Sequence, residues 1–442
     1  MRKAACRIVE KLRLHGYEAF FAGGWVRDFI LRRRPKDIDI ATSALPDEVL
    51  RLFPHSRTIG ARFGVVQVPM YGHAYEVATF RSDNDYHDGR HPGSVAFSSP
   101  EQDALRRDFT INGLFYDPVA GRLIDYVHGR NDLQAKLIRT IGDPSQRFSE
   151  DKLRMLRAVR LACMLGFRIV PETWNAIQKL APGIRQISWE RIRDELTRIF
   201  TAPSAAAGLD LLHDSGLLLC IMPEIEAMRG IPESPEAAPE FDVFTHTRTT
   251  LSLLRKPSTI LAFGTLLHDV GKPVACSCTE QDTIEQHTLM GAKIAEEVCR
   301  RLKMSNEEIN RVADLVATHG EFSKVREMRE SALKRFLRRP HFADHLELYR
   351  VNCISKQKDL ETYTYCLSKF KEHQQHPAPI PLISGEDLLD MGYSPGPLFK
   401  VILEFVEDLQ LEGTVRTREE ALAHVKSAFP KTEATQPHSR LD

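Results

Sequence analysis

The stretch Gly23-Gly24-Trp25-Val26-Arg27-Asp28, followed by Asp37-Ile38-Asp39, decides the fold of this chain. The apolar run Glu18–Ala22 before the glycines, and the apolar–polar alternation at residues 37–40, predict a strand, a glycine turn, a helix and a second strand. Two glycines between a strand and a helix let backbone N–H groups approach a triphosphate closely, and Arg27 adds positive charge there.

The two aspartates of this stretch indicate a metal site. Carboxylates at i and i+2 on a strand point to the same face of the sheet. Asp37 and Asp39 therefore suit Mg²⁺ held between the phosphates of a nucleotide and an attacking hydroxyl. Glu76, in the predicted strand Tyr75–Phe80, is the candidate for a third carboxylate. A lone Gly-Gly pair is usually a turn and a lone Asp-x-Asp a solvated strand end, but their joint order favours a nucleotide site.

The rest of the chain divides by periodicity. A chain of 442 residues exceeds one ordinary core, so two or more domains are expected. We expect a helix at about 3–15 and strands at 18–22, 37–40, 64–70 and 75–80. From Ser149 the apolar residues recur at helix spacing. A linker rich in Pro, Glu and Ala at 231–240 precedes further helices to about Ala428.

Composition limits the classes of protein without choosing among them. Sixty basic and 60 acidic residues cancel, so any nucleic-acid footprint must be a local patch. The eight cysteines form no CxxC pair, which disfavours a zinc ribbon or a disulfide framework. The start reads as an amphipathic helix, and no apolar run approaches the roughly 18 residues that span a bilayer. We therefore expect no membrane partner and a cytoplasmic location.

Four ordered motifs resemble the class II tRNA nucleotidyltransferase and bacterial poly(A) polymerase family. They are GGWVRD, PKDIDIAT, RRDFTING at 106–113 and EDKLRMLRAVR at 150–160, and the likeness reaches about residue 220. The resemblance implies an α+β chain, with a polymerase-beta-like head containing a small mixed sheet and then all-α neck, body and tail regions. The implied domains are a head at 1–140, a nucleotide-base and RNA-binding neck and body at 141–230, an HD-like helical domain at 241–360, a helical tail at 361–430 and a disordered end at 431–442.

The resemblance also implies roles for single residues. Asp37 and Asp39 match the metal-binding pair, and Gly24 and Arg27, beside Gly23, match the triphosphate contacts. In the motif RRDFTING, Arg107 would meet phosphate, while Asp108 and Asn112 would address the ribose. In the motif EDKLRMLRAVR, Asp151 and Arg154 would pair with the incoming base.

The spacing of the last pair has a physical sense of its own. Asp151 and Arg154, at i and i+3, would share a helix face and offer an acceptor and a forked donor to the edges of cytosine and adenine. The alternative is that Asp151 and Arg154 form a surface ion pair, which would contribute little to stability. Arg157 and Arg160 extend the same face, and we expect them to contact phosphate.

The polar segment Asp83–Pro92 predicts a mobile loop. In the resembled family a flexible loop here accompanies the incorporation of A, and enzymes that add only CC are shortened. Its presence argues against a CC-only enzyme.

Histidines in the second half suggest another site. His246, His268-Asp269, His287 and His319 could hold a second divalent metal that activates water against a phosphoester. The string LLHDVGK at 266–272 resembles the HD phosphohydrolase superfamily, although Asn352 stands where that family usually has Asp. Its plausible target is a damaged tRNA 3′ end carrying a phosphate or cyclic phosphate.

The sequence therefore predicts an enzyme that adds CCA, or the terminal A, to tRNA 3′ ends from CTP and ATP with Mg²⁺ and without a template. A poly(A) polymerase of the same superfamily, a metal-dependent HD phosphohydrolase acting on RNA ends and a non-catalytic RNA-binding protein are the alternatives. Motifs leave open the choice between CCA and A addition, the activity of the HD site and the oligomeric state.

Overall fold

The computed structural model describes residues 1–35, 37–59, 64–86, 92–234, 240–278, 284–374 and 380–430. The chain forms two compact units, Met1–Ala313 and Asp314–Asp442. The finer division into head, neck, HD-like and tail regions stays a prediction, and the predicted disordered end lies outside the described residues. Across those residues, every helix is too short or too polar to cross a bilayer.

A seven-stranded mixed sheet forms the core of the N-terminal part of the first unit, as predicted for the head. Its strand order is β3-β4-β5-β2-β1-β8-β9, with β2 and β5 parallel and the other neighbours antiparallel. The strands are β1 (Ala19–Ala22), β2 (Asp39–Thr42), β3 (Arg57–Thr58), β4 (Val65–Met70), β5 (His73–Thr79), β8 (Phe115–Asp117) and β9 (Arg122–Ile124).

The register of this sheet brings the glycine turn, Asp39 and Glu76 together. In the antiparallel pair β1–β2, Ala22 lies opposite Asp39, so the end of β1 and the start of β2 meet at one edge. In the parallel pair β2–β5, Ile40 lies opposite Val77, which brings Asp39 beside Glu76 on the neighbouring strand.

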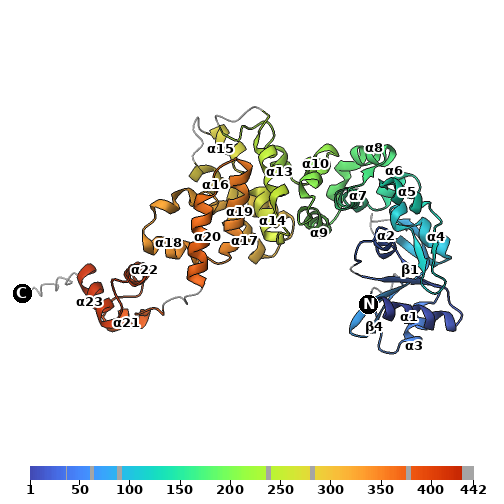
Figure 1. Cartoon of the computed structure of the whole chain (residues 1–442), viewed down its shortest axis with the longest axis horizontal. Coiled ribbons are helices and arrows are strands. Elements are labelled where there is room, and N and C mark those ends of the chain that lie inside the picture. The colour runs from blue at the N-terminus through green and yellow to red at the C-terminus, as the bar shows by residue number, and fades with distance from the viewer. Residues whose placement is uncertain are drawn as a thin grey trace, which may run out of the picture. The chain divides into compact units, whose positions relative to one another are not determined.

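Short helices cover and connect these strands (Figure 1). Helix α1 (Arg2–Leu14) packs on β1 and β2 because Ala4, Ala5, Ile8, Val9 and Leu12 recur on one face and are buried. The others are α2 (Gly24–Ile30), α3 (Pro46–Leu52), α4 (Pro100–Leu105), the 3₁₀ turn η2 (Thr110–Asn112) and α5 (Gly129–Ala135).

The segment predicted as a loop contributes a hairpin. Strands β6 (Arg81–Tyr86) and β7 (Pro92–Phe97) pair antiparallel, with Arg81 opposite Phe97 and Tyr86 opposite Pro92. Backbone pairing needs no apolar alternation, so the polar composition concealed these strands. Residues 87–91 of the predicted loop lie outside the described residues.

Helices make up the remainder of the first unit, as the periodicity predicts. They are α6 (Pro144–Glu150), α7 (Leu153–Leu165), α8 (Pro171–Leu180), η3 (Ala181–Gln186), α9 (Trp189–Phe200), α10 (Ala205–Asp214), α11 (Leu217–Ile221), α12 (Pro223–Glu226), α13 (Val243–Leu253), α14 (Thr259–Leu267), α15 (Lys272–Cys278), α16 (Ile284–Arg301) and α17 (Asn306–Thr318), which runs across the unit boundary. The two-stranded parallel ladder of β10 (Leu137–Ile138) and β11 (Arg168–Ile169) lies among them.

The described part of the second unit is also helical. Its elements are η4 (Glu321–Glu327), α18 (Glu330–Leu337), α19 (Phe342–Ser355), α20 (Glu361–Gln374), α21 (Gly385–Asp390), α22 (Pro397–Leu411) and α23 (Arg418–Ala428). The last of these ends at the residue where the sequence pattern predicts the helices to end. One apolar cluster gathers around Phe322 and Phe342, and another gathers around Leu388 and Ile402.

Candidate active site

Gly23 lies at the centre of the predicted nucleotide site. It has a φ of +65°, in the region that favours glycine, at the turn between β1 and α2. A methyl group on Gly23 would lie 3.1 Å from Arg107 Nη1 and 4.0 Å from Asp39 Oδ2. The turn therefore brings together the glycine backbone, the carboxylate of Asp39 and the guanidinium group of Arg107.

The aspartate pair shares one face, as predicted, but only one member lies on the strand. Asp37 and Asp39 are exposed while Ile38 and Ile40 are buried, and β2 begins at Asp39. Desolvation of the carboxyl group, and then the negative charges of Glu76 and Asp37, raise the pKa of Asp39 to about 6, against an opposing effect of Arg107. Such a concentration of carboxylates fits a divalent cation, which prefers oxygen ligands.

The triphosphate and ribose candidates form a continuous chain of hydrogen bonds. Arg27 Nη1 donates to Asn112 Oδ1 at 2.8 Å, and Asn112 Nδ2 donates to Asp108 Oδ1 at 3.2 Å. Arg157 Nε donates to Asp108 Oδ2 at 2.8 Å. Burial alone would raise the pKa of Asp108, but Arg157 and Asn112 outweigh it and lower that pKa to about 2. The ribose candidate is thus a fixed anion, held from both the head and α7.

The structure corrects the prediction that Asp151 and Arg154 share a helix face. Helix α6 ends at Glu150, Asp151 has an extended backbone, and α7 begins at Leu153. The carboxylate of Asp151 accepts from the Leu153 N–H at 3.0 Å, and such a local side-chain to backbone hydrogen bond competes with a continuous helix.

The base-reading candidates instead have separate partners. Asp151 Oδ2 accepts from Arg191 Nη2 at 2.7 Å, and Arg154 Nη1 donates to Glu150 Oε2 at 2.7 Å. Arg154 is buried, at 8 % exposure, so its guanidinium is held in one orientation by the protein. The structure therefore gives each of these side chains its own protein partner, Arg191 for Asp151 and Glu150 for Arg154.

Arg157 and Arg160, expected to contact phosphate, both pair with carboxylates of the protein. Arg157 holds Asp108, as described above. Arg160 Nε donates to Glu195 Oε2 of α9 at 2.5 Å, with only 13 % of the arginine side chain exposed. The structure thus gives both arginines internal partners.

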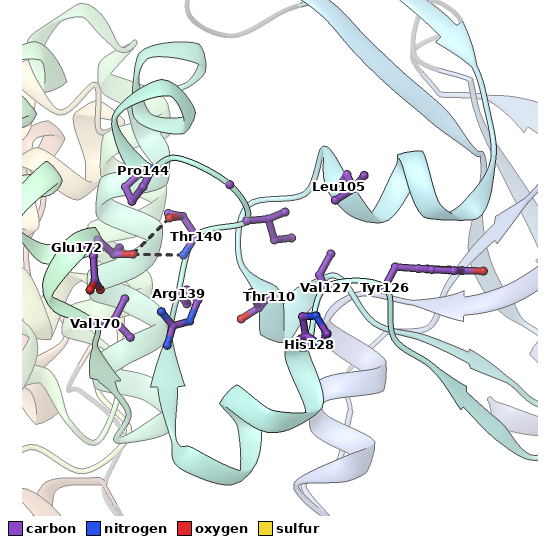
Figure 2. Close-up of a pocket in the computed structure, with 13 residues that line it drawn as sticks. Leu105, Thr110, Tyr126, Val127, His128, Arg139, Thr140, Pro144, Val170 and Glu172 are labelled. Atoms are coloured by element: carbon purple, nitrogen blue, oxygen red, sulfur yellow. Dashed lines mark hydrogen bonds between the residues drawn. The ribbon is translucent and has the colours of Figure 1, made fainter.

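A pocket of about 440 Å³ adjoins the motif RRDFTING at 106–113 (Figure 2). Its walls are Leu105, Thr110, Tyr126, Val127, His128, Arg139, Thr140, Ile141, Gly142, Pro144, Val170, Glu172 and Thr173. The predicted site residues are absent from these walls. The pocket therefore lies beside the nucleotide site rather than in it.

Three of the predicted HD residues form a compact, buried group in the first unit. His246 of α13, and His268 and Asp269 after α14, place one ligand atom each within 4.8 Å of one another. His246 Nε2 lies 3.0 Å from His268 Nε2, and His268 Nδ1 lies 2.8 Å from the carbonyl oxygen of Thr265. That carbonyl accepts a hydrogen bond from Nδ1–H, which leaves the Nε2 lone pair directed at the group. Two imidazoles and a carboxylate are a ligand set that suits a transition metal.

The remaining HD candidates are His287, His319 and Asn352. His287 of α16 has Nε2 3.7 Å from Asp269 Oδ1, so it adjoins the same group. A methyl group on Gly271 would lie 2.1 Å from the His287 carbonyl oxygen, so glycine at this position permits the close approach of α16. His319 and Asn352 belong to the second unit.

Sequence reasoning missed the residues that hold the site in place. Asp103, Glu195 and Arg191 pair with Arg107, Arg160 and Asp151, respectively. Asp103 had a local signal, because an acidic residue four positions before an arginine can pair with it on a helix. Glu195 and Arg191 lie 35 and 40 positions from their partners, and no local pattern indicates such pairs.

Three family models match the chain, and together they define a class of polymerase-type nucleotidyltransferases. The poly(A) polymerase head domain matches residues 19–139, and an RNA and SrmB-binding site of polymerase A matches 166–229. Domain 2 of tRNA nucleotidyltransferases matches 286–425. The segment with His246, His268 and Asp269 falls between the second and third matches.

Individual relatives narrow the class. The CCA-adding enzyme of Bacillus licheniformis is 32% identical over 428 residues, which are 95% of this chain and 96% of that protein. The CCA-adding enzyme of Geobacillus stearothermophilus is 46% identical over 214 residues, so the match covers 48% of this chain and about half, 53%, of that relative's length. The chain belongs to the family of CCA-adding enzymes.

Solved structures agree on the fold. The Bacillus stearothermophilus CCA-adding enzyme in complex with CTP superimposes with a TM-score of 0.70 at 28% identity, over 96% of this chain and 98% of that one. The Thermotoga maritima CCA-adding enzyme complexed with tRNA has a TM-score of 0.60 at 17% identity, over 96% of this chain and 94% of that one, and shows a shared fold.

Proposed function

We propose that this protein adds CCA, or its terminal A, to the 3′ end of tRNA from CTP and ATP without a nucleic-acid template. The observation that carries the proposal is the convergence on Gly23 of Asp39 and Arg107, next to the hydrogen-bonded chain from Arg27 to Asp108. Relatives that bear the name CCA-adding enzyme, one of them crystallised with CTP and one with tRNA, support the choice of substrates.

Each group of residues has a part in the proposed transfer. Arg27, Arg107 and the backbone at Gly23 and Gly24 bind the triphosphate. Asp108 and Asn112 accept and donate to the ribose hydroxyls and so prefer NTP to dNTP. Asp151 and Arg154 offer an acceptor and a forked donor to the base edge. The tRNA 3′-hydroxyl then attacks the α-phosphorus in line and pyrophosphate leaves, with positioning and electrostatics as the main contributions.

A divalent cation belongs to this proposal because of the three carboxylates at the sheet edge. Asp37, Asp39 and Glu76 would hold Mg²⁺, which when bound lowers the pKa of the attacking hydroxyl and neutralises charge on the departing pyrophosphate. Desolvation is the first cause of the raised pKa of Asp39, and the negative charges of Glu76 and Asp37, which such an ion would offset, add to it.

The test uses purified protein, Mg²⁺ and three tRNA transcripts that end at the discriminator base, at C and at CC. Each receives CTP, ATP or both, and products are resolved at single-nucleotide length. Growth of the shortest transcript by CCA supports full CCA addition, and growth of the CC-ended transcript alone by one A supports A addition. Long A ladders on any RNA would replace the proposal by poly(A) synthesis, and no growth at all would overturn it.

A second activity rests on the group formed by His246, His268 and Asp269. We infer that this group, with His287 adjoining it, would hold a divalent transition metal, which when bound would supply an activated water for attack on a phosphate monoester or cyclic phosphate at a tRNA 3′ end. Lys272 supports the arrangement, because its Nζ lies 3.1 Å from Asp269 Oδ2 and 2.7 Å from Glu233 Oε2.

Metal content and hydrolysis test this activity separately. Protein loaded with Ni²⁺ or Mn²⁺ and dialysed should retain about one metal ion per chain, and Asp269→Ala should lose it. Hydrolysis of a 3′-phosphorylated tRNA should fall in parallel. Equal metal retention by wild type and Asp269→Ala would contradict the site.

A further inference from the structure

Asp103 is a buried carboxylate next to the nucleotide site that the mechanism above does not use. It lies on α4 and is 1 % exposed. Its Oδ1 accepts from Arg106 Nε at 2.8 Å, and its Oδ2 accepts from Arg107 Nε at 3.1 Å and from Arg107 Nη2 at 2.8 Å. Burial alone would raise its pKa, but the two guanidinium groups outweigh this and lower the pKa of Asp103. Asp103 is therefore an anion at neutral pH.

These contacts fix one orientation of Arg107. While Nε and Nη2 face Asp103, Nη1 donates to the carbonyl oxygen of Asn112 at 3.4 Å and lies 3.1 Å from the position of a methyl group on Gly23. The guanidinium carbon also lies 4.9 Å from the centre of the Phe115 ring. An unrestrained arginine loses rotamer entropy when it binds a ligand, so a guanidinium already held in place binds more tightly.

The charges of Asp103, Arg106 and Arg107 favour the binding of an anion at the glycine turn. One carboxylate shared by two guanidinium groups leaves one net positive charge. Arg107 is the member that faces the turn, because it is the one close to Gly23 and the one whose charge lowers the pKa of Asp39. Arg106 occupies the other carboxylate oxygen, Oδ1.

We propose that Asp103 is a positioning residue for the nucleotide triphosphate and acts through Arg107. The inference rests on the proposed function, since the ligand is the triphosphate of the incoming CTP or ATP. Asp103 touches no substrate itself; it sets the direction in which Arg107 meets the phosphates.

The test is Asp103→Asn, which keeps the shape and removes the charge. Equilibrium binding of CTP and CMP, and the KM and kcat for addition of one C, are measured on the full chain. The Kd and KM for CTP are expected to rise about tenfold, the loss of one charge-assisted contact, while kcat and CMP affinity change less than about threefold. A uniform loss for CTP and CMP would mean a merely structural role and overturn the inference.

A double-mutant cycle identifies the partner. In an Arg107→Ala background Asp103→Asn should cause no further loss of CTP affinity, whereas in an Arg106→Ala background it should cause the full tenfold loss. Additive losses with Arg107→Ala would overturn the proposal. Because partial unfolding raises an apparent Kd by the reciprocal of the folded fraction, the folded fraction of each variant is measured by circular dichroism and its Kd is corrected for it.

Failure of the proposed function is a different outcome. A wild-type protein that binds CTP but extends no tRNA would overturn nucleotide addition, and the binding cycle would still decide the role of Asp103. Wild-type protein without CTP affinity would overturn both.

Discussion

Asp108 links the chemistry of the site to the stability of the fold. Its pKa is about 2 in the folded chain against an ordinary value of 3.8, mainly because Arg157 and Asn112 stabilise the anion against the effect of burial. A depressed carboxyl pKa adds stability at pH values above the ordinary pKa, and this stability disappears as the pH falls toward the folded-state value.

We therefore expect Asp108→Asn to lower the free energy of unfolding by about 2 kcal/mol at pH 7. The difference from wild type should shrink as the pH falls from about 4 toward 2. Calorimetric unfolding of both proteins across this range measures it. A difference that is the same at pH 7 and at pH 3 would contradict the assigned pKa.

Gly23 is the residue at which backbone conformation and binding geometry meet. Gly23→Ala should abolish most nucleotide addition, by at least about a hundredfold, because the methyl group both strains a positive φ and displaces Arg107 Nη1. Gly121→Ala is the matched control, since Gly121 has a φ of +67° and open space around it. The control should lose about 1 kcal/mol of stability and keep its kcat/KM. Equal activities of the two variants would refute the central position of Gly23.

At the scale of elements, the break between α6 and α7 separates the two residues that are proposed to contact the base. Asp151 and Arg154 flank the start of α7, and each is held by its own partner, Arg191 or Glu150. The sequence predicts the two residues and their pairing with a base, but a continuous helical pattern hides the break. The hydrogen bond at this break, which the Leu153 N–H donates to the Asp151 carboxylate, became evident only in three dimensions.

Arg154→Ala should reduce selectivity among nucleotides more than the rate of transfer. A four-nucleotide competition on a CC-ended transcript is expected to show a loss of discrimination of about tenfold or more, because a fork of two donors is removed. Arg198→Ala, whose side chain is 59% exposed, controls for the loss of an arginine on a neighbouring helix. Unchanged selectivity of Arg154→Ala would remove this residue from base reading.

Element prediction from the sequence succeeded where patterning was strong. The strands around the glycine turn and the helices from α6 onward were predictable because each buries one face, and its apolar residues therefore recur at the period of a strand or a helix. The hairpin β6–β7 was missed because its backbone pairing leaves no apolar signature. The carboxylates Asp103 and Glu195 were missed because their role is to hold Arg107 and Arg160, and that role shows only once the chain has folded.

At the scale of the whole molecule, the four N-terminal motifs and the histidine group are proposed to serve two chemistries on one chain. Similarity to the Bacillus licheniformis CCA-adding enzyme extends over 95% of the chain, whereas the matched family models leave out the segment with His246, His268 and Asp269. The comparisons confirm the nucleotidyltransferase that the motifs predicted, and the chemistry of the histidine group stays a prediction. The division into units at residue 313 depends on packing between helices with similar patterns, and no feature of the sequence indicated it.

One measurement tests the central claim most directly. Wild type, Asp39→Ala and Asp269→Ala are each incubated with a tRNA transcript ending at the discriminator base, CTP, ATP and Mg²⁺, and tRNA binding is measured in parallel. We predict extension by wild type and by Asp269→Ala, and no extension by Asp39→Ala despite near-normal tRNA binding. Extension by Asp39→Ala at the wild-type rate would contradict the account.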